Sequence, residues 1–329
     1  MDTIQSFLGS LKQGGRQNHL NLTMIPLLMA DSGEPDYLIL EEAISQGLLF
    51  ITEVSEGGRV PDLKLINKSA DRVLVVEGEE LIGAKQNRIV NASFLIDGNT
   101  EFVIPVSCVE QGRWTYRSQK FASGEKVMPS ILRREHQKKV AESLNRGGGF
   151  RSDQGMIWNE ISEKSARMNV HSSTGAMADL FEGQKNHLAE YLKAFHLVDC
   201  QVGALFAING KVAGLDCFGH WQAFSKFFKK LVQSYALDAL DWLEEGKGGG
   251  DIPAAEIRRF LEGIQRAPRK LFPSIGLGEN IRLEGPFISG AALTYNETVL
   301  HLSAFGHDGK KDEGSVVPFR RFSQRRSKI

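Results

Sequence analysis

Cysteine is scarce in this sequence: Cys108, Cys200 and Cys217 are the only three among 329 residues, and no two of them form a C-x-x-C pair. A disulfide framework needs an even set of cysteines and a zinc knuckle needs closely spaced pairs, so neither is indicated. So few cysteines are typical of proteins in a reducing compartment. We therefore expect a cytoplasmic protein.

Long apolar runs are missing as well. A membrane-spanning helix needs roughly 18 or more consecutive apolar residues, and no stretch of the chain approaches that length. The first residues, Met1–Leu8, are not basic and contain no long apolar core, so they do not have the features of a signal peptide. The sequence predicts no association with a membrane.

An excess of charge of either sign is also absent, because 40 basic residues balance 40 acidic ones. Zero net charge gives no general reason to expect nucleic acid or an anionic surface as a partner. Residues 320–328 form a basic tail, which could contact nucleic acid, but such a chain end is more often solvated. We do not expect a nucleic-acid partner.

The eight histidines show no metal-binding pattern. His187 and His196 lie nine residues apart, which matches neither an i,i+4 pair nor a zinc-finger spacing. His301 and His307 flank a predicted strand and are interpreted as structural. The sequence therefore assigns no metal ligand and names no cofactor, although sites made of carboxylates follow weaker spacing rules.

What the chain does contain is a series of short apolar, β-branched runs separated by turn residues. In the first part of the chain, spacings of about ten residues are typical of antiparallel strands, and from Pro129 the periodicity becomes helical. The predicted strands are 20–29, 48–54, 63–66, 73–76, 89–96, 102–109, 202–208, 212–218, 280–284, 290–295 and 298–305. The predicted helices are 2–12, 36–46, 130–144, 156–168, 174–195, 221–245 and 253–265.

This order predicts an α+β fold, because strands and helices do not alternate as they do in a doubly wound sheet. We expect an N-terminal antiparallel β-rich unit at residues 1–125, a central helical region at 126–200, and a C-terminal mixed α/β unit at 201–329 that includes the basic tail. The three segments could also form one compact domain. Two glycine runs, Gly147–Gly149 and Gly248–Gly250, lack the context of a phosphate-binding loop and are interpreted as flexible connections.

Polar residues are unusually dense in the first motif, residues 77–88 (EGEELIGAKQNR), which directly follows the apolar strand 73–76. A phosphate-binding P-loop is not supported. It needs a lysine directly after the second glycine and then Ser or Thr, but Ala84 precedes Lys85 and Gln86 follows it. A nucleoside triphosphatase is therefore not expected.

The side chains of this motif suit a polar, anionic ligand. Carboxylates at a strand end can act as acids, bases or cation ligands, whereas lysine and arginine bind phosphate or carboxylate groups. The candidate catalytic residues are Glu77, Glu79 and Glu80, and the candidate ligand-binding residues are Lys85, Gln86, Asn87 and Arg88. The alternative is that the acids and bases pair with one another on a solvated hairpin, where each pair contributes roughly 0–1 kcal/mol.

A second motif, residues 107–114 (SCVEQGRW), ends the predicted strand 102–109. If the strands form one antiparallel sheet, this end lies near the first motif. Glu110 is then a further candidate catalytic residue, Arg113 a contact for an anion, and Trp114 a stacking surface for a base or sugar. The alternative is a tryptophan packed in the core, and Cys108 is better interpreted as a buried structural thiol than as a nucleophile.

The first motif resembles the hallmark of the ARG and Rhodanese-Phosphatase-superfamily-associated Protein domain family. Residues 203–218 and the following 234–239 (SYALDA) are similar to that family's second half, and the resemblance covers roughly residues 15–305. The family is associated with ADP-ribosylglycohydrolases and rhodanese-phosphatase proteins. The resemblance therefore implies a role near ADP-ribose or NAD-derived nucleotides, but it assigns no catalytic residue.

Two hypotheses for the function follow. In the first, the protein binds or processes an ADP-ribose-like or other phosphorylated metabolite linked to NAD metabolism, at a concave site that contains a carboxylate with a perturbed pKa. In the second, it is a non-catalytic ligand- or protein-binding module in which Lys85 and Arg88 neutralise the acids. The sequence does not decide whether the protein is an enzyme. It makes a small anionic metabolite the expected partner.

Overall fold

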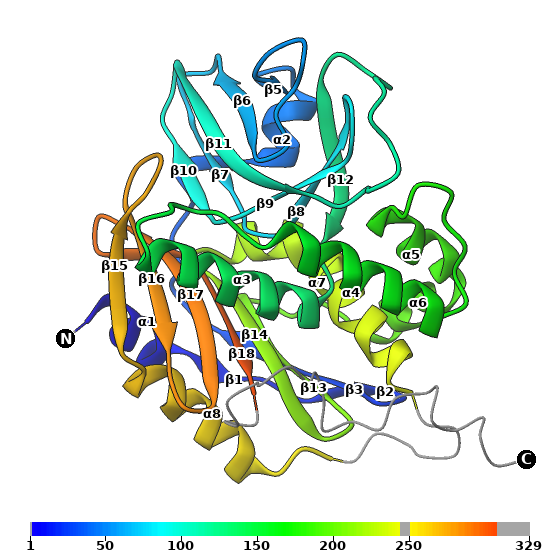
Figure 1. The fold of residues 1–329 in the computed structure, drawn as a ribbon. Coiled ribbons are helices and arrows are strands. Elements are labelled where there is room, and N and C mark those ends of the chain that lie inside the picture. Colours follow the sequence, from blue (N-terminus) through cyan, green and yellow to red (C-terminus); the bar gives the residue numbers. More distant parts are fainter. Residues whose placement is uncertain (1, 244–250, 308–329) are drawn as a thin grey trace, which may run out of the picture.

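The fold consists of two groups of strands with helices between and around them (Figure 1). The computed structural model describes residues 2–243 and 251–307. The basic tail at 320–328 and the glycine run Gly248–Gly250 lie outside the described residues. The observed order of strands, helices and strands confirms the predicted α+β class.

The larger group is a nine-stranded sheet in which every paired neighbour is antiparallel. Its order is β1 (Lys12–Gln13), β3 (Leu22–Leu28), β13 (Gln201–Ile208), β14 (Lys211–Phe218), β18 (Thr298–Gly306), β17 (Ile288–Tyr295), β16 (Glu279–Glu284) and β15 (Arg269–Pro273), with β2 (Gln17–His19) paired to β3. The sheet thus combines strands from both ends of the described chain. The predicted division into segments at residues 125 and 200 stays a prediction.

Helices cover both faces of this sheet, which explains why the central strand β13 is buried along its whole length. One face packs against α3 (Ser130–Asn145) and α7 (Trp221–Asp241), and the other against α1 (Thr3–Ser10) and α8 (Ala254–Arg266). The aromatic residues along α7 are in the core, where the ring of Phe227 stacks on Phe218.

The second group is a β-unit built from two smaller sheets around its own core. The six-stranded sheet has the order β12 (Phe121–Val127), β8 (Glu79–Gly83), β9 (Arg88–Val90), β11 (Thr100–Cys108), β6 (Asp62–Asn67) and β5 (Leu49–Glu53). The three-stranded sheet has the order β10 (Phe94–Ile96), β7 (Arg72–Val75) and β4 (Tyr37–Ile39), and β4 pairs with β7 in parallel.

Two predicted elements of the β-unit differ from the structure. The predicted helix at 36–46 begins as the strand β4, and only α2 (Leu40–Ser45) is helical. The predicted strand 89–96 is interrupted after Val90, where buried Asn91 donates a hydrogen bond to Phe150 O and leaves the sheet pattern. Its halves, β9 and β10, therefore enter different sheets.

The remaining helices, α4 (Gln154–Arg167), α5 (Met177–Gly183) and α6 (Lys185–Ala194), lie at one side of the molecule (Figure 1). The predicted helix 174–195 is thus two helices separated at Gln184. The helix α3 lies between the β-unit and the nine-stranded sheet, so its side chains contact both (Figure 1). Within residues 2–243 and 251–307, no helix combines the length and apolarity needed to cross a membrane.

Candidate functional site

The first motif folds as a hairpin in which β8 pairs with β9, so that Leu81 lies opposite Arg88. The hairpin is mostly buried, which argues against the alternative of a solvated hairpin. On its other side β9 pairs with the end of β11, where Cys108 lies opposite Arg88. The predicted proximity of the two motifs is therefore confirmed.

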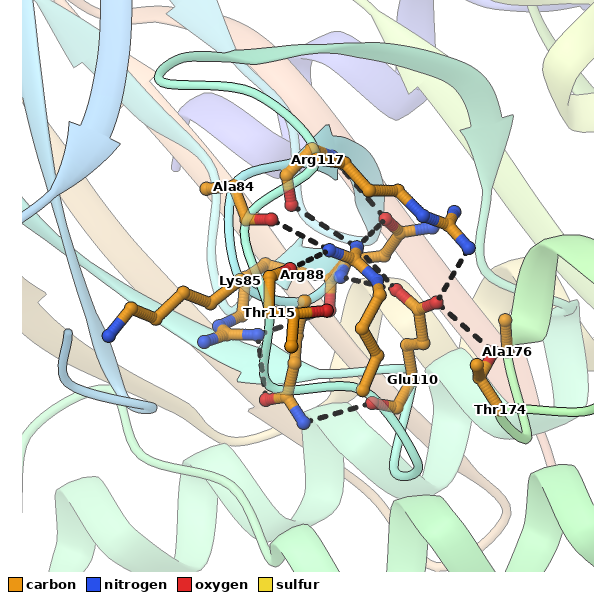
Figure 2. Close-up of polar contacts among 12 residues, drawn as sticks. Ala84, Lys85, Arg88, Glu110, Thr115, Arg117, Thr174 and Ala176 are labelled. Atoms are coloured by element: carbon orange, nitrogen blue, oxygen red, sulfur yellow. Dashed lines mark hydrogen bonds and ion pairs between the residues drawn. The ribbon is translucent and has the colours of Figure 1, made fainter. Parts of the chain in front are cut away.

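The centre of the combined site is the fully buried carboxylate of Glu110. It accepts hydrogen bonds from Arg113 Nη2 at 2.6 Å, from Asn87 N at 3.0 Å and from Thr174 Oγ1 at 3.0 Å (Figure 2). Burial alone would raise the pKa of Glu110, but the hydrogen bonds from Arg113 and Asn87 outweigh it and hold the pKa below its ordinary value. We call these four residues the Glu110 cluster.

Arg113 also fixes the turn of the hairpin. Its guanidinium donates to Ala84 O at 2.7 Å, to Gly83 O at 3.3 Å and to Asn87 Oδ1 at 3.1 Å. These donors match the backbone carbonyls of a turn in which Ala84 has a φ of +39°. Because its terminal nitrogens are occupied, Arg113 has a structural role in this arrangement rather than a free group for an anion.

Gln86 and Arg88 connect the hairpin to the second motif. Gln86 Nε2 donates to Glu110 O at 3.0 Å, and Gln86 Oε1 accepts from Arg88 Nη1 at 3.0 Å. Arg88 is fully buried, and its Nε and Nη2 have no hydrogen-bond partner, because the nearest carboxylate oxygen, of Glu53, is 3.9 Å away. Burial lowers the pKa of Arg88, and Cys108 and Glu53 oppose that effect.

Lys85, Trp114 and Tyr116 form a surface beside this buried network. Trp114 and Tyr116 are each 44% exposed, so the tryptophan is not in the core. Lys85 Nζ lies 5.3 Å from the ring centre of Trp114 and 5.1 Å from that of Tyr116. Its side chain extends away from Glu110 (Figure 2). We call these three residues the cation–aromatic surface.

Glu80 lies on the inner side of the hairpin and is an unusual acid. Its Oε1 accepts from Asn87 Nδ2 at 3.4 Å, whereas its Oε2 has no hydrogen-bond partner. Burial raises the pKa of Glu80 to about 8, although Asn87 and Lys126 oppose the shift. Glu80 therefore holds a proton at neutral pH.

The other two predicted acids point elsewhere. Glu79 accepts from Lys230 Nζ at 3.3 Å and from Val76 N at 2.9 Å, and burial raises its pKa even though Lys230 acts in the opposite direction. Glu77 points toward α3, where Gln137 Nε2 donates to its Oε2 at 3.3 Å. The structure therefore groups Glu80 and Glu110 with the ligand-binding candidates, and it separates Glu77 and Glu79 from them.

Three neighbours of the site were not predicted. Tyr116 and Arg117 follow Trp114 almost directly, so extending the second motif by three residues would have included them. Arg117 Nη2 lies 3.6 Å from Glu110 Oε1, and its side chain is 56% exposed. Thr174 carries no signal of this kind, because only the tertiary fold brings it to Glu110.

A pocket of about 410 Å³ adjoins the second motif. Gln111 contributes to its wall, together with Trp158, His171 and Ser172. No residue of the first motif lines it. The concave site expected where the two motifs meet is therefore not this pocket.

No metal centre is evident in the parts of the chain that the structure describes, and Cys108 does not have the environment of a reactive thiol. Residues 2–243 and 251–307 contain no group of three or more His, Cys, Asp or Glu side chains placed to hold a metal ion. Cys108 is buried and free, and burial raises the pKa of its thiol. Since the thiolate is the nucleophile, this environment fits the structural interpretation of Cys108.

Comparison with known proteins gives one match. The model of the ARG and Rhodanese-Phosphatase-superfamily-associated Protein domain matches residues 10–305, which include both sheet groups and the whole hairpin. Searches of curated proteins and of solved structures gave no match. Because the match extends over most of its length, the chain belongs to the ARG and Rhodanese-Phosphatase-superfamily-associated Protein domain family.

Proposed function

We propose that the protein binds a phosphorylated, nucleotide-like metabolite of the ADP-ribose type at the cation–aromatic surface. The observation that carries this proposal is the placement of Lys85 Nζ about 5 Å from two half-exposed rings, Trp114 and Tyr116. An aromatic face can stack on a base, which contributes about 1–3 kcal/mol, and a nearby ammonium group can bind phosphate.

The charges around this surface support an anionic ligand. Lys85 donates a hydrogen bond to Gly57 O at 2.8 Å, which fixes its position without neutralising its charge. Arg117 extends from the same segment with an exposed side chain, and buried Arg88 lies 5.6 Å from the ring centre of Trp114. Glu110, which lies 3.6 Å from Arg117, is already occupied by Arg113, and the carboxylate nearest Arg88 is that of buried Glu53, 3.9 Å from its Nη2.

The same arrangement supports binding rather than catalysis as the primary activity. The ionised Glu110 has no free oxygen, because both of its oxygens accept hydrogen bonds. Processing of the ligand is a second candidate function, and one observation favours it: Glu80 has a pKa of about 8, which suits a general acid. The family's association with ADP-ribosylglycohydrolases supports the ligand class, and the free cysteines suit the proposed cytoplasmic location.

Calorimetric titration of the full chain with ADP-ribose tests the proposal. Trp114→Ala should weaken binding by roughly 5- to 150-fold, in line with the stacking contribution of about 1–3 kcal/mol. Lys85→Gln should also weaken binding, with little change in stability, because an exposed cation–π contact contributes about 0.5–1 kcal/mol.

Trp221→Ala is the matched control, since Trp221 is 43% exposed at the start of α7 and lies outside both motifs. This variant should bind ADP-ribose like the original chain. The proposal is wrong if the original chain does not bind ADP-ribose at millimolar concentration, or if Trp114→Ala binds it unchanged.

A further inference from the structure

A second polar cluster lies between the β-unit and the nine-stranded sheet, away from the cation–aromatic surface. Its floor is one face of the nine-stranded sheet. Across the intervening strand β17, Arg282 of β16 lies in the same cross-strand row as Ser303 of β18, and Asn280 of β16 lies in the same row as His301 of β18. Its wall is α3, which contributes His136 and Gln137, and its roof includes Glu77 of the first motif. We call these seven residues, Glu77, His136, Gln137, Asn280, Arg282, His301 and Ser303, the Arg282 cluster.

Arg282 is the residue in this cluster that most needs a partner. Its side chain is 1% exposed, and none of its three guanidinium nitrogens has a hydrogen-bond partner. The nearest carboxylate oxygen, Glu77 Oε2, is 3.6 Å from Nη1. A buried guanidinium without hydrogen bonds is strongly unfavourable, so this geometry indicates a group that supplies acceptors to Arg282.

The adjacent ion pair cannot supply them. Arg133 donates to both oxygens of Asp216, at 2.6 and 2.9 Å, and Tyr235 also donates to this carboxylate. Burial would raise the pKa of Asp216, but Arg133 outweighs it and keeps that pKa below its ordinary value. The charge of Asp216 is therefore matched by Arg133, and the carboxylate that pairs with Arg282 is that of Glu77.

Other atoms of the cluster show what a ligand of Arg282 must offer. Glu77 Oε1, Gln137 Oε1 and Asn280 Oδ1 are buried acceptors without a donor. A ligand that fits must therefore present acceptors to Arg282 and hydrogen atoms to these oxygens. A phosphate group that retains an acidic hydrogen does both, whereas a fully ionised sulfate has no hydrogen to donate and would meet the charge of Glu77.

The residue beside this position is Phe150, which directly follows the glycine run after α3. Gly147 and Gly149 have φ values of +75° and +72° and are exposed, so they provide conformations that other residues rarely adopt. The next residue, Phe150, is buried, and the guanidinium carbon of Arg282 lies 5.9 Å from its ring centre. Opening this short loop would uncover Arg282.

We propose that the Arg282 cluster is a second binding site, which takes a protonated phosphate group and is closed in this structure by the loop at residues 147–150. The site does not depend on the function proposed for the cation–aromatic surface. Arg282 binds the phosphate oxygens, Glu77 accepts its hydrogen, and Phe150 covers the bound group.

Calorimetric titration with inorganic phosphate tests this site in the full chain. We expect the original chain to bind phosphate and Arg282→Met to lose at least tenfold in affinity. Arg266→Met is the control, because the side chain of Arg266 is 81% exposed and pairs only at the surface with Glu262. Lys85→Gln should still bind phosphate, which separates this site from the cation–aromatic surface.

Two further variants test the assigned roles. The original chain should not bind sulfate, whereas the isosteric Glu77→Gln should bind it, because the repulsion is removed. Phe150→Ala should accelerate phosphate association. Three results would overturn the proposal: no phosphate binding, unchanged affinity in Arg282→Met, or equal affinity of the original chain for sulfate and phosphate. An unchanged association rate in Phe150→Ala would remove the role of the loop.

Discussion

The Glu110 cluster and the Arg282 cluster contain the same kinds of buried groups but satisfy them differently. Both oxygens of Glu110 accept hydrogen bonds, and Arg113 Nη1 and Nη2 both donate. In contrast, Arg282 has no hydrogen bond at any guanidinium nitrogen. The comparison teaches that density of charge in a motif does not identify a binding site. A buried charge with unmet hydrogen bonds is the more informative feature, because its burial is costly unless something pairs with it.

Removing the carboxylate of Glu110 should have the largest effect on stability. Glu110→Ala leaves Arg113 buried and unpaired, so the free energy of unfolding should fall by about 3–5 kcal/mol, as for other broken buried ion pairs. Urea denaturation measures this change. The control is Glu101→Ala, which removes a surface pair with Lys64 and should cost about 0–1 kcal/mol. A loss in Glu110→Ala no larger than in this control would contradict the role of the cluster.

Glu80 should give the protein a pH dependence of intermediate size. The folded protein keeps the proton of Glu80 up to about pH 8, whereas the unfolded chain releases it near pH 4.5. Between these values the folded state binds more protons, so stability falls as the pH rises. Glu80→Gln should remove this decline and be more stable than the original chain at pH 7, by about 3 kcal/mol for the roughly 2.5 pH units between 4.5 and 7.

Thermal unfolding measured from pH 5 to pH 8 tests this prediction. Glu142→Gln serves as the control, because Glu142 is a half-exposed residue of α3 that pairs with Lys139. That variant should keep the pH profile of the original chain. Parallel profiles for Glu80→Gln and the original chain would show that Glu80 does not hold its proton in the folded state.

Replacing Arg282 and Glu77 together, as Arg282→Met with Glu77→Gln, should have the smallest effect, and one of opposite sign to Glu110→Ala. Replacing both members of a buried ion pair by uncharged side chains of similar volume is often neutral or stabilising, so without phosphate the free energy of unfolding of this double variant should be unchanged or about 1 kcal/mol higher. Denaturation in phosphate-free buffer measures it. A loss comparable to that of Glu110→Ala would mean that Arg282 is as well paired as Arg113, and the contrast between the clusters would disappear.

The sequence predicted those parts of the fold that depend on local chemistry. The predicted strands 202–208 and 212–218 form the hairpin of β13 and β14, in which both turn residues, Asn209 and Gly210, have positive φ. The strand β12 was missed, because polar residues interrupt its apolar pattern and Gly124 lies at its centre, where a side chain would clash with Glu80. Local patterns do not show such close packing between strands.

The candidate site was predictable only in its sequence-local part. We predicted that the two motifs lie close together because each one adjoins the end of a strand in the same expected antiparallel sheet. The strands that carry them, β9 and β11, do pair. The direction of each acid did not follow, because it depends on distant partners: Lys230 of α7 for Glu79, and Arg282 of β16 for Glu77. The roles assigned to the site residues stay predictions.

The pairing of β3 with β13 also determines when the large sheet can form during synthesis. The whole β-unit and the helices α3 to α6 lie between these two strands in the chain. The β-unit can therefore collapse around its own core before β13 emerges, whereas β3 must wait for a partner far along the chain. Such non-local pairing slows folding, so completion of the nine-stranded sheet should be the late, rate-limiting event. Any fragment that ends before residue 201 should leave β3 paired with β1 and β2 but not with β13.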